Sequence, residues 1–229
     1  MKIYHTALSI SVFILCAATN VFAQDWANLK EFQEANQSLG EVAPYENRVV
    51  FMGNSITIGW LKKRPEFFEN KPYVNRGISG QTTPQMLLRF RQDVVDLDPK
   101  AVVILAGTND IAGNTGPSTL EMIVDNIKSM AEIAHANDIK VVLCSTLPAY
   151  DYPWRPGLEP APKILELNKM IKAYAEEKDH VYVDYFSAMA DERNGLPKKY
   201  ADDGVHPTVE GYKVMEPLVE EAISSALND

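Results

Sequence analysis

Cysteine is nearly absent from this chain of 229 residues, which contains only Cys16 and Cys144. If the first residues are removed on export, one thiol remains and no disulfide can form within the chain. A hydrophobic core must then hold the domain together. Cys144 ends the apolar run 141–144, which favours a buried, inert thiol over a nucleophilic one.

Positive charge is also in deficit. The 22 Lys and Arg residues face 31 Asp and Glu residues, so the formal net charge is −9, or −10 without Lys2. This excess of negative charge argues against nucleic acids and anionic membrane surfaces as partners. Histidine is scarce, with four residues, and no close pair of His or Cys has the spacing of metal ligands. We therefore expect no metal site.

Only the apolar run near the N-terminus has a pattern that differs from that of a core segment. Lys2 and His5 precede the apolar residues 7–18, and Ala23 is a small residue before Gln24. This pattern is typical of a secretory signal peptide and is too short for a stable membrane span. We predict that residues 1–23 are removed and that residues 24–229 form one secreted or periplasmic domain.

Two alternatives for the N-terminal residues are weaker. A first amphipathic helix of the domain is disfavoured because residues 8–18 carry no charge. A lipoprotein anchored through Cys16 is disfavoured because Leu15 is bulkier than a lipidation site usually allows.

Apolar strand segments alternate with amphipathic helical segments along the remaining chain. This alternation predicts a parallel sheet covered by helices on both faces. Right-handed crossovers leave few topologies, and we expect a flavodoxin-like three-layer α/β/α sandwich with five parallel strands in the order 2-1-3-4-5. The expected strands are 48–52, 73–76, 101–106, 139–143 and 180–185, and the expected helices are 25–39, 55–70, 83–95, 118–136, about 164–174, and one from about 208, which Pro217 should kink.

The first strand ends in Gly53-Asn54-Ser55, which places Ser55 at the sheet edge where such folds bind ligands. Ser55 is a candidate nucleophile, although an ordinary turn serine has the same pattern. The segment is not the elbow of α/β-hydrolases, because Thr57 stands where that turn requires a second glycine. It also lacks the glycine-rich fingerprint and lysine of nucleotide-binding loops.

A base for Ser55 is available in Asp203-x-x-His206. A carboxylate three residues before a histidine can bind Nδ1 and leave Nε2 free to take a serine proton. The alternative is that Asp203 caps a helix and that His206 is a surface residue. Asp202 and Asp184 are alternative orienting acids.

Two other histidines have an acid at the same spacing but the wrong position. His135 ends a helix before the fourth strand and His180 opens the fifth strand. Both therefore belong to the amino-terminal edge of the sheet, opposite Ser55, and His206 is the histidine that we expect to reach it.

Two further strand ends offer donors for a developing oxyanion. The amide of Asn109, after the third strand, can donate to such a charge. Gly80, after the second strand, lets the backbone N–H approach a ligand closely. Each also has an ordinary explanation as a turn residue. All of these segments meet at one edge of a parallel sheet, which favours the functional interpretation.

These segments together resemble the four blocks of the SGNH hydrolases, also called GDSL esterases. The matching segments are Gly53-Asn54-Ser55-Ile56, Gly80, Gly107-Thr108-Asn109-Asp110 and Asp203-x-x-His206-Pro207, in the family's order, over nearly all of the chain from Arg48 onward.

The resemblance implies a metal-free esterase with a flavodoxin-like fold. By position, Ser55 is the nucleophile, His206 the base and Asp203 the acid. The oxyanion donors are the N–H groups of Gly80 and Ser55 and the amide of Asn109. Asn54 departs from the family pattern, which has Asp there, and we expect activity to survive.

We predict hydrolysis of short acyl, first of all acetyl, esters on carbohydrate, with Asn54, Tyr150, Trp154 and Arg155 as substrate-binding candidates. Aromatic faces can stack on sugars, although the same residues can simply pin the loop. A lysophospholipase or short-chain lipid esterase is the runner-up, and a catalytically silent binding module on the same fold is a third possibility.

Overall fold

The computed structural model describes residues 25–228. The predicted signal peptide and its cleavage site lie outside these described residues. Between residues 25 and 228, no helix combines the length and the apolar character that crossing a membrane requires.

Five parallel strands form one sheet in the order β2-β1-β3-β4-β5, which confirms the predicted fold class. The register pairs Gly53 with Gly77 on one side and with Leu105 on the other, so the first three strands end level. The segments that follow them therefore leave the sheet at one edge. The strands are β1 (Val49–Gly53), β2 (Tyr73–Gly77), β3 (Ala101–Leu105), β4 (Lys140–Cys144) and β5 (Val181–Val183).

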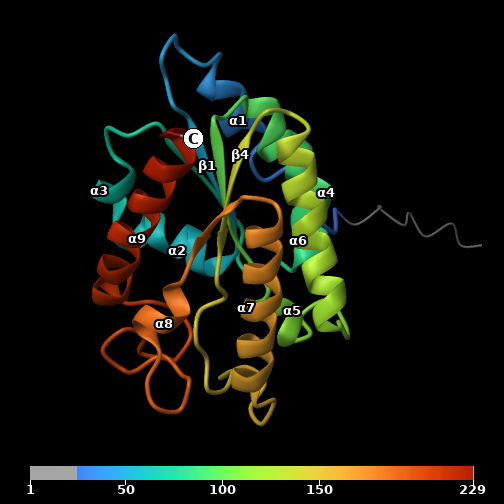
Figure 1. The fold of residues 1–229 in the computed structure, drawn as a ribbon, viewed down its shortest axis with the longest axis vertical. Coiled ribbons are helices and arrows are strands. Elements are labelled where there is room, and N and C mark those ends of the chain that lie inside the picture. Colours follow the sequence, from blue (N-terminus) through green and yellow to red (C-terminus); the bar gives the residue numbers. More distant parts are fainter. Residues whose placement is uncertain (1–24, 229) are drawn as a thin grey trace, which may run out of the picture.

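Helices cover both faces of the sheet (Figure 1). One layer contains α4 (Thr83–Asp93), α6 (Leu120–His135) and α7 (Pro160–Glu177). The other layer contains α2 (Ser55–Lys63), α3 (Pro65–Phe68), α8 (Tyr185–Met189) and α9 (Val209–Asn228). Two further short helices are α1 (Gln33–Leu39) and α5 (Thr108–Ile111).

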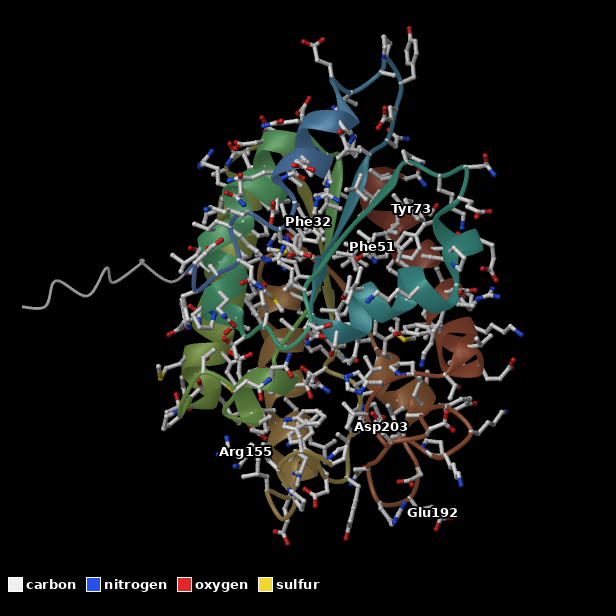
Figure 2. All side chains as sticks on the ribbon, turned by 180° about the vertical axis from the view of Figure 1, so that it is seen from behind. Phe32, Phe51, Tyr73, Arg155, Glu192 and Asp203 are labelled. Carbon is white, nitrogen blue, oxygen red and sulfur yellow. The ribbon has the colours of Figure 1, made fainter. Side chains whose placement is uncertain are left out.

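The two cores follow from the alternation of side chains along each strand. Val50 and Met52 point into the core under α4, α6 and α7. Val49 and Phe51 point into the core under α2, α3, α8 and α9. Phe51 lies at the centre of an aromatic cluster, with its ring centroid 5.2 Å from that of Tyr73 (Figure 2). Every residue of β1 is buried, as expected for a central parallel strand.

Two helix boundaries differ from the sequence predictions for local reasons. The helix expected over 55–70 breaks at Arg64, whose φ of −137° and ψ of 57° leave the helical region before Pro65. The helix expected over 25–39 starts only at Gln33, because the Asp25 carboxylate accepts from the N–H groups of Leu29 and Lys30 and forms a turn.

The N-cap of α6 is Thr119, whose hydroxyl accepts from Met122 N at 3.2 Å. The short helices α5 and α8 were not among the expected helices. In contrast, α9 continues as one helix through Pro217.

Candidate active site

Ser55 is the first residue of α2, immediately after β1 and its N-cap. Its backbone N–H is one of the helix N-terminal donors that have no partner within the helix. The turn requires Gly53, because a Cβ there would lie 2.0 Å from Thr57 Oγ1. The strand end thus presents both the hydroxyl and the N–H of Ser55 at the carboxyl edge of the sheet.

Asn54 has a structural task in this turn. Its side chain is buried and its Oδ1 accepts from Ile56 N at 3.0 Å, which caps α2. Asn and Asp are equally good N-cap residues, so Asn replaces the family's Asp without loss of this bond. The structure thus assigns Asn54 Oδ1 to the helix cap, and a contact of Asn54 with substrate stays a prediction.

The Ser55 hydroxyl, the His206 ring and the Asp203 carboxylate form one hydrogen-bonded chain. Ser55 Oγ lies 3.0 Å from His206 Nε2, and His206 Nδ1 lies 2.7 Å from Asp203 Oδ2. A carboxylate only accepts, so the proton of the neutral ring belongs on Nδ1 and Nε2 is the acceptor for the serine. These are the protonation states that a general base requires.

Asp203 is fixed by the backbone as well as by the histidine. Its Oδ1 accepts from the N–H groups of Val205 and His206 at 2.9 and 2.8 Å. Partial burial opposes its ionisation, but these bonds and the His206 ring together lower the pKa of the Asp203 carboxyl. Asp184, the alternative acid, instead caps α8 by accepting from the N–H and hydroxyl of Ser187, and Asp202 is exposed.

Two further contacts, besides the hydrogen bonds of Ser55, His206 and Asp203, hold α2 against the loop that contains His206. The buried Tyr212 hydroxyl, on α9, donates to Ile56 O at 2.8 Å, and Lys63 Nζ donates to Pro207 O at 2.6 Å. Each contact joins a residue near Ser55 in sequence to one near His206. Together they set the spacing between the serine and the histidine.

The segments that carry Gly80 and Asn109 are fastened to each other residue by residue. Gly80 O accepts from Asn114 Nδ2 at 3.1 Å, and Gln81 O accepts from Asn109 Nδ2 at 2.9 Å. The next two residues continue the contact, with Thr82 Oγ1 2.9 Å from Thr115 Oγ1 and Thr83 bound to Asp110. One amide hydrogen of Asn109 is therefore held by Gln81, and the second has no acceptor within residues 25–228.

Two glycines permit this arrangement. Gly80 is exposed, has a φ of 77°, and has open space where a Cβ would be. Gly107 has a φ of 106°, and a Cβ there would lie 2.7 Å from the Leu167 side chain. Both conformations favour glycine over residues with a side chain.

Asp110 is an almost fully buried carboxylate between these segments. Burial raises its pKa to about 6, against the opposing effect of the hydrogen bonds from Thr83. Asp110 was not among the predicted site residues.

Arg89 is a second buried charged residue that was not predicted to belong to the site. It is 0% exposed and pairs with Asp93 at 3.1 Å. Its Nη2 donates to Gly53 O at 3.1 Å and its Nε donates to Gln81 Oε1 at 2.6 Å, which links the Ser55 turn to the Gly80 segment. A signal was present in the sequence, because Arg89 and Asp93 are an i,i+4 pair on the face of α4 that contains Met86.

The loop after β4 places the Trp154 ring beside His206. The Trp154 ring is 41% exposed, stacks on Tyr152 at 5.0 Å, and has its centroid 6.0 Å from that of His206. Tyr150 is 56% exposed. Arg155 lies at the same end of the molecule as Asp203 (Figure 2), and its Nη1 donates to the carbonyl oxygens of Ala112 and Gly113. Arg155 thus holds the loop to the segment after α5.

Within residues 25–228, no cluster of three or more His, Cys, Asp or Glu side chains is arranged to hold a metal ion.

Comparison with known proteins agrees with this geometry. The profile of the GDSL-like Lipase/Acylhydrolase family matches residues 51–214. The crystal structure of a GDSL-like lipase from Bacteroides thetaiotaomicron is 50% identical, with a TM-score of 0.85 over 88% of this chain and 99% of that chain.

More distant relatives share less. Axe2, an acetylxylan esterase from Geobacillus stearothermophilus, is 20% identical, with a TM-score of 0.61 over 80% of this chain and 96% of that chain, which is a likeness of fold. The Bacillus subtilis protein described as uncharacterized lipoprotein YqeF is 35% identical over 82 residues. That match spans 34% of each chain, so this chain covers about a third of that curated relative.

The family match extends over most of the chain and includes the Ser55 turn, residues 80–83, residues 109–115 and His206. The chain belongs to the GDSL-like Lipase/Acylhydrolase family and is a carboxylic ester hydrolase.

Proposed function

We propose that this chain is a secreted serine esterase that removes acetyl or other short acyl groups from carbohydrate through an acyl-enzyme. The observation that carries the proposal is the hydrogen-bonded chain from Ser55 Oγ to His206 Nε2 at 3.0 Å and from His206 Nδ1 to Asp203 Oδ2 at 2.7 Å. These distances fit a serine and its general base.

In the first half of the reaction, Ser55 Oγ attacks the ester carbonyl carbon while His206 Nε2 takes the hydroxyl proton. The ester C–O bond then breaks, and His206 returns that proton to the leaving alcohol. In the second half, His206 takes a proton from water as the water attacks the acyl-enzyme, and it protonates Ser55 as the acid leaves. Asp203 holds the ring in position and stabilises its positive charge.

Three donors support the negative oxygen of each tetrahedral intermediate. They are the N–H of Ser55 at the start of α2, the N–H of Gly80, and the amide hydrogen of Asn109 that Gln81 does not hold. The positive end of α2 adds to this stabilisation. Their mutual positions depend on the contacts between residues 80–83 and residues 109–115, so the donors are fixed before substrate binds.

The carbohydrate preference is supported by two exposed rings, that of Trp154 beside His206 and that of Tyr150, which lines a surface groove together with Asp203. Such rings provide flat apolar faces, which suit the C–H faces of sugars. A lipid esterase or lysophospholipase is the alternative within the same chemistry. Hydrolysis of octanoyl esters much faster than acetyl esters would favour it.

Export is supported by the predicted signal peptide and by the lipoprotein description of the Bacillus subtilis relative. N-terminal sequencing of the mature protein tests this part of the proposal, with Gln24 as the expected first residue. A mature chain that starts at Met1 would contradict it.

The central test is the Ser55→Ala variant, assayed with p-nitrophenyl acetate and with a fluorophosphonate probe. We expect loss of hydrolysis and of labelling, and in the unaltered protein we expect the label on the peptide that contains Ser55. Ser225→Ala, an exposed serine on α9, is the matched control. Full activity of a folded Ser55→Ala protein would refute the mechanism and would favour a binding module.

A further inference from the structure

A groove of about 260 Å³ borders Asp203, the residue that binds His206. Two loops form it, residues 150–156 after β4 and residues 193–204 after α8. Its lining is mostly ring-shaped or apolar and includes Tyr150, Pro153, Pro156 and Leu196. The catalytic mechanism uses only Asp203 among the residues that line this groove.

The floor of the groove is built in advance of any ligand. The guanidinium of Arg193 lies over the Tyr150 ring at 4.9 Å. Asp191 holds Arg193 in place by accepting from its Nη2 at 3.1 Å and from its backbone N–H at 2.9 Å. Gly195 allows the close approach, because a Cβ there would lie 2.8 Å from Tyr150 Cβ. Tyr150 remains 56% exposed, so part of its ring is free for a ligand.

The direction of the reaction decides which part of an ester enters this groove. His206 Nε2 must protonate the leaving oxygen, so the alcohol part of the substrate lies on the histidine side of Ser55. Trp154 borders that side, with its ring 6.0 Å from His206 and stacked on Tyr152, which lines the groove. The groove therefore continues the path of the alcohol and not of the acyl group.

The charged residues that line the groove indicate which kind of alcohol can bind there. Asp151 and Asp203 line the groove with two negative charges, against one positive charge from Arg193. Both Asp151 oxygens already accept backbone N–H groups, from Tyr152 and Gly157. A ligand with its own negative charge is disfavoured there, whereas a neutral ring with an apolar face and hydroxyl groups fits the stacked Tyr150 and the free donors of Arg193.

We propose that the groove between Tyr150 and Arg193 is a subsite for a neutral sugar residue next to the acylated one, so the enzyme prefers acylated oligosaccharides to acylated monosaccharides. A second cavity of about 390 Å³, which shares Tyr150, Asp151 and Arg193 with the groove, gives the oligosaccharide room to continue. The inference rests on the proposed function and deepens it.

The test compares a monoacetylated neutral trisaccharide with p-nitrophenyl acetate, which contains no sugar residue. For Tyr150→Ala and Arg193→Ala, we expect the ratio of kcat/KM for the trisaccharide to kcat/KM for p-nitrophenyl acetate to fall roughly 3- to 10-fold. Tyr150→Phe keeps the ring and should keep the ratio within about 2-fold. Tyr45→Ala, at a fully exposed tyrosine remote in sequence from both loops, is the matched control.

A binding measurement separates this inference from the proposed function. The Ser55→Ala protein should bind the acetylated trisaccharide in calorimetry. The double variant that also carries Tyr150→Ala should bind it more weakly. An unchanged ratio and unchanged binding in the Tyr150→Ala proteins would overturn the subsite and leave the esterase mechanism standing. Equal or tighter binding of a trisaccharide carrying uronic acids would overturn the neutral-sugar assignment. Retained hydrolysis by Ser55→Ala alone would instead contradict the proposed function.

Discussion

Asp110 binds Thr83 through the backbone N–H and the hydroxyl, with Oδ1 2.6 Å from Thr83 Oγ1 and both carboxylate oxygens within 3.1 Å of Thr83 N. This contact joins the start of α4 to the segment that contains Asn109. Asn126 Nδ2 donates to the same Thr83 hydroxyl at 3.1 Å and supports it from α6. The two segments that carry the proposed oxyanion donors therefore meet over one buried carboxylate.

Asp110→Asn should lower kcat more than it raises KM, because the donors would be displaced from the transition-state oxygen while the substrate still binds. We expect a loss of roughly 10-fold, less than the 10²–10³ that follows removal of a donor itself. Steady-state kinetics with p-nitrophenyl acetate measures it, and Asp125→Asn, at an exposed acid of α6, is the control. An equal loss in both variants, or a change in KM alone, would contradict this positioning role.

The raised pKa of Asp110 also predicts a pH dependence of stability. The folded chain binds the Asp110 proton below about pH 6, whereas the unfolded chain releases it above the ordinary value of 3.8. In that window the folded state holds more protons, so the Asp110 contribution to the free energy of unfolding falls as pH rises. Urea unfolding from pH 4 to 7 should show this slope in the unaltered protein. A slope of the same size in Asp110→Asn would refute the assignment.

Asn109→Ala should reduce kcat by roughly 10² to 10³, because it removes one amide donor from the oxyanion. The fold should persist, although the bond to Gln81 O is lost as well. Thermal unfolding followed by circular dichroism checks the fold beside the kinetics. Asn137→Ala, at an exposed residue after α6, should change neither kcat nor the unfolding temperature noticeably.

The two candidate acids differ in what they hold, and paired variants distinguish them. Asp203→Asn should lower kcat on the order of 10⁴, since it disturbs the histidine tautomer. Asp184→Asn removes the charge from the α8 cap and should leave kcat nearly unchanged, with a small effect on stability. The reverse pattern would assign the orienting role to Asp184.

The lowered pKa of Asp203 also predicts a pH dependence of stability, of the opposite sign to that of Asp110. Because the folded value lies below the ordinary value of 3.8, Asp203 stabilises the fold above that pH. The contribution is lost as pH falls through the folded pKa. Acid unfolding should therefore begin at a higher pH in Asp203→Ala than in the unaltered protein, and coincident transitions would contradict this.

Tyr212→Phe should destabilise the fold by about 1–3 kcal/mol, because Ile56 O then loses a buried donor. We also expect a lower kcat, since this bond is one of two that set the distance between α2 and the His206 loop. Urea unfolding and steady-state kinetics measure the two effects. Tyr45→Phe, at a fully exposed tyrosine, provides the comparison and should match the unaltered protein in both.

The fold was readable from the sequence because the strands are local and strongly patterned. Residues 101–105 are apolar throughout, as a strand buried on both faces must be, and the helices repeat apolar residues at helical spacing. Chirality and short connections then leave the order 2-1-3-4-5 as the simplest topology. Boundaries were less predictable, since Pro65 and the Asp25 turn act through single local contacts.

The sequence by itself determined the strand order and the residue types at each strand end, because periodicity and chain chirality are encoded locally. Only the tertiary structure decided which partner each polar group takes. Asp184 caps a helix, whereas Asp203 binds His206. The side chains of Asn54 and Arg155 bind backbone groups. Arg89 and Asp110 are buried and connect loops. These choices depend on distances between residues far apart in sequence, which packing against the two cores sets.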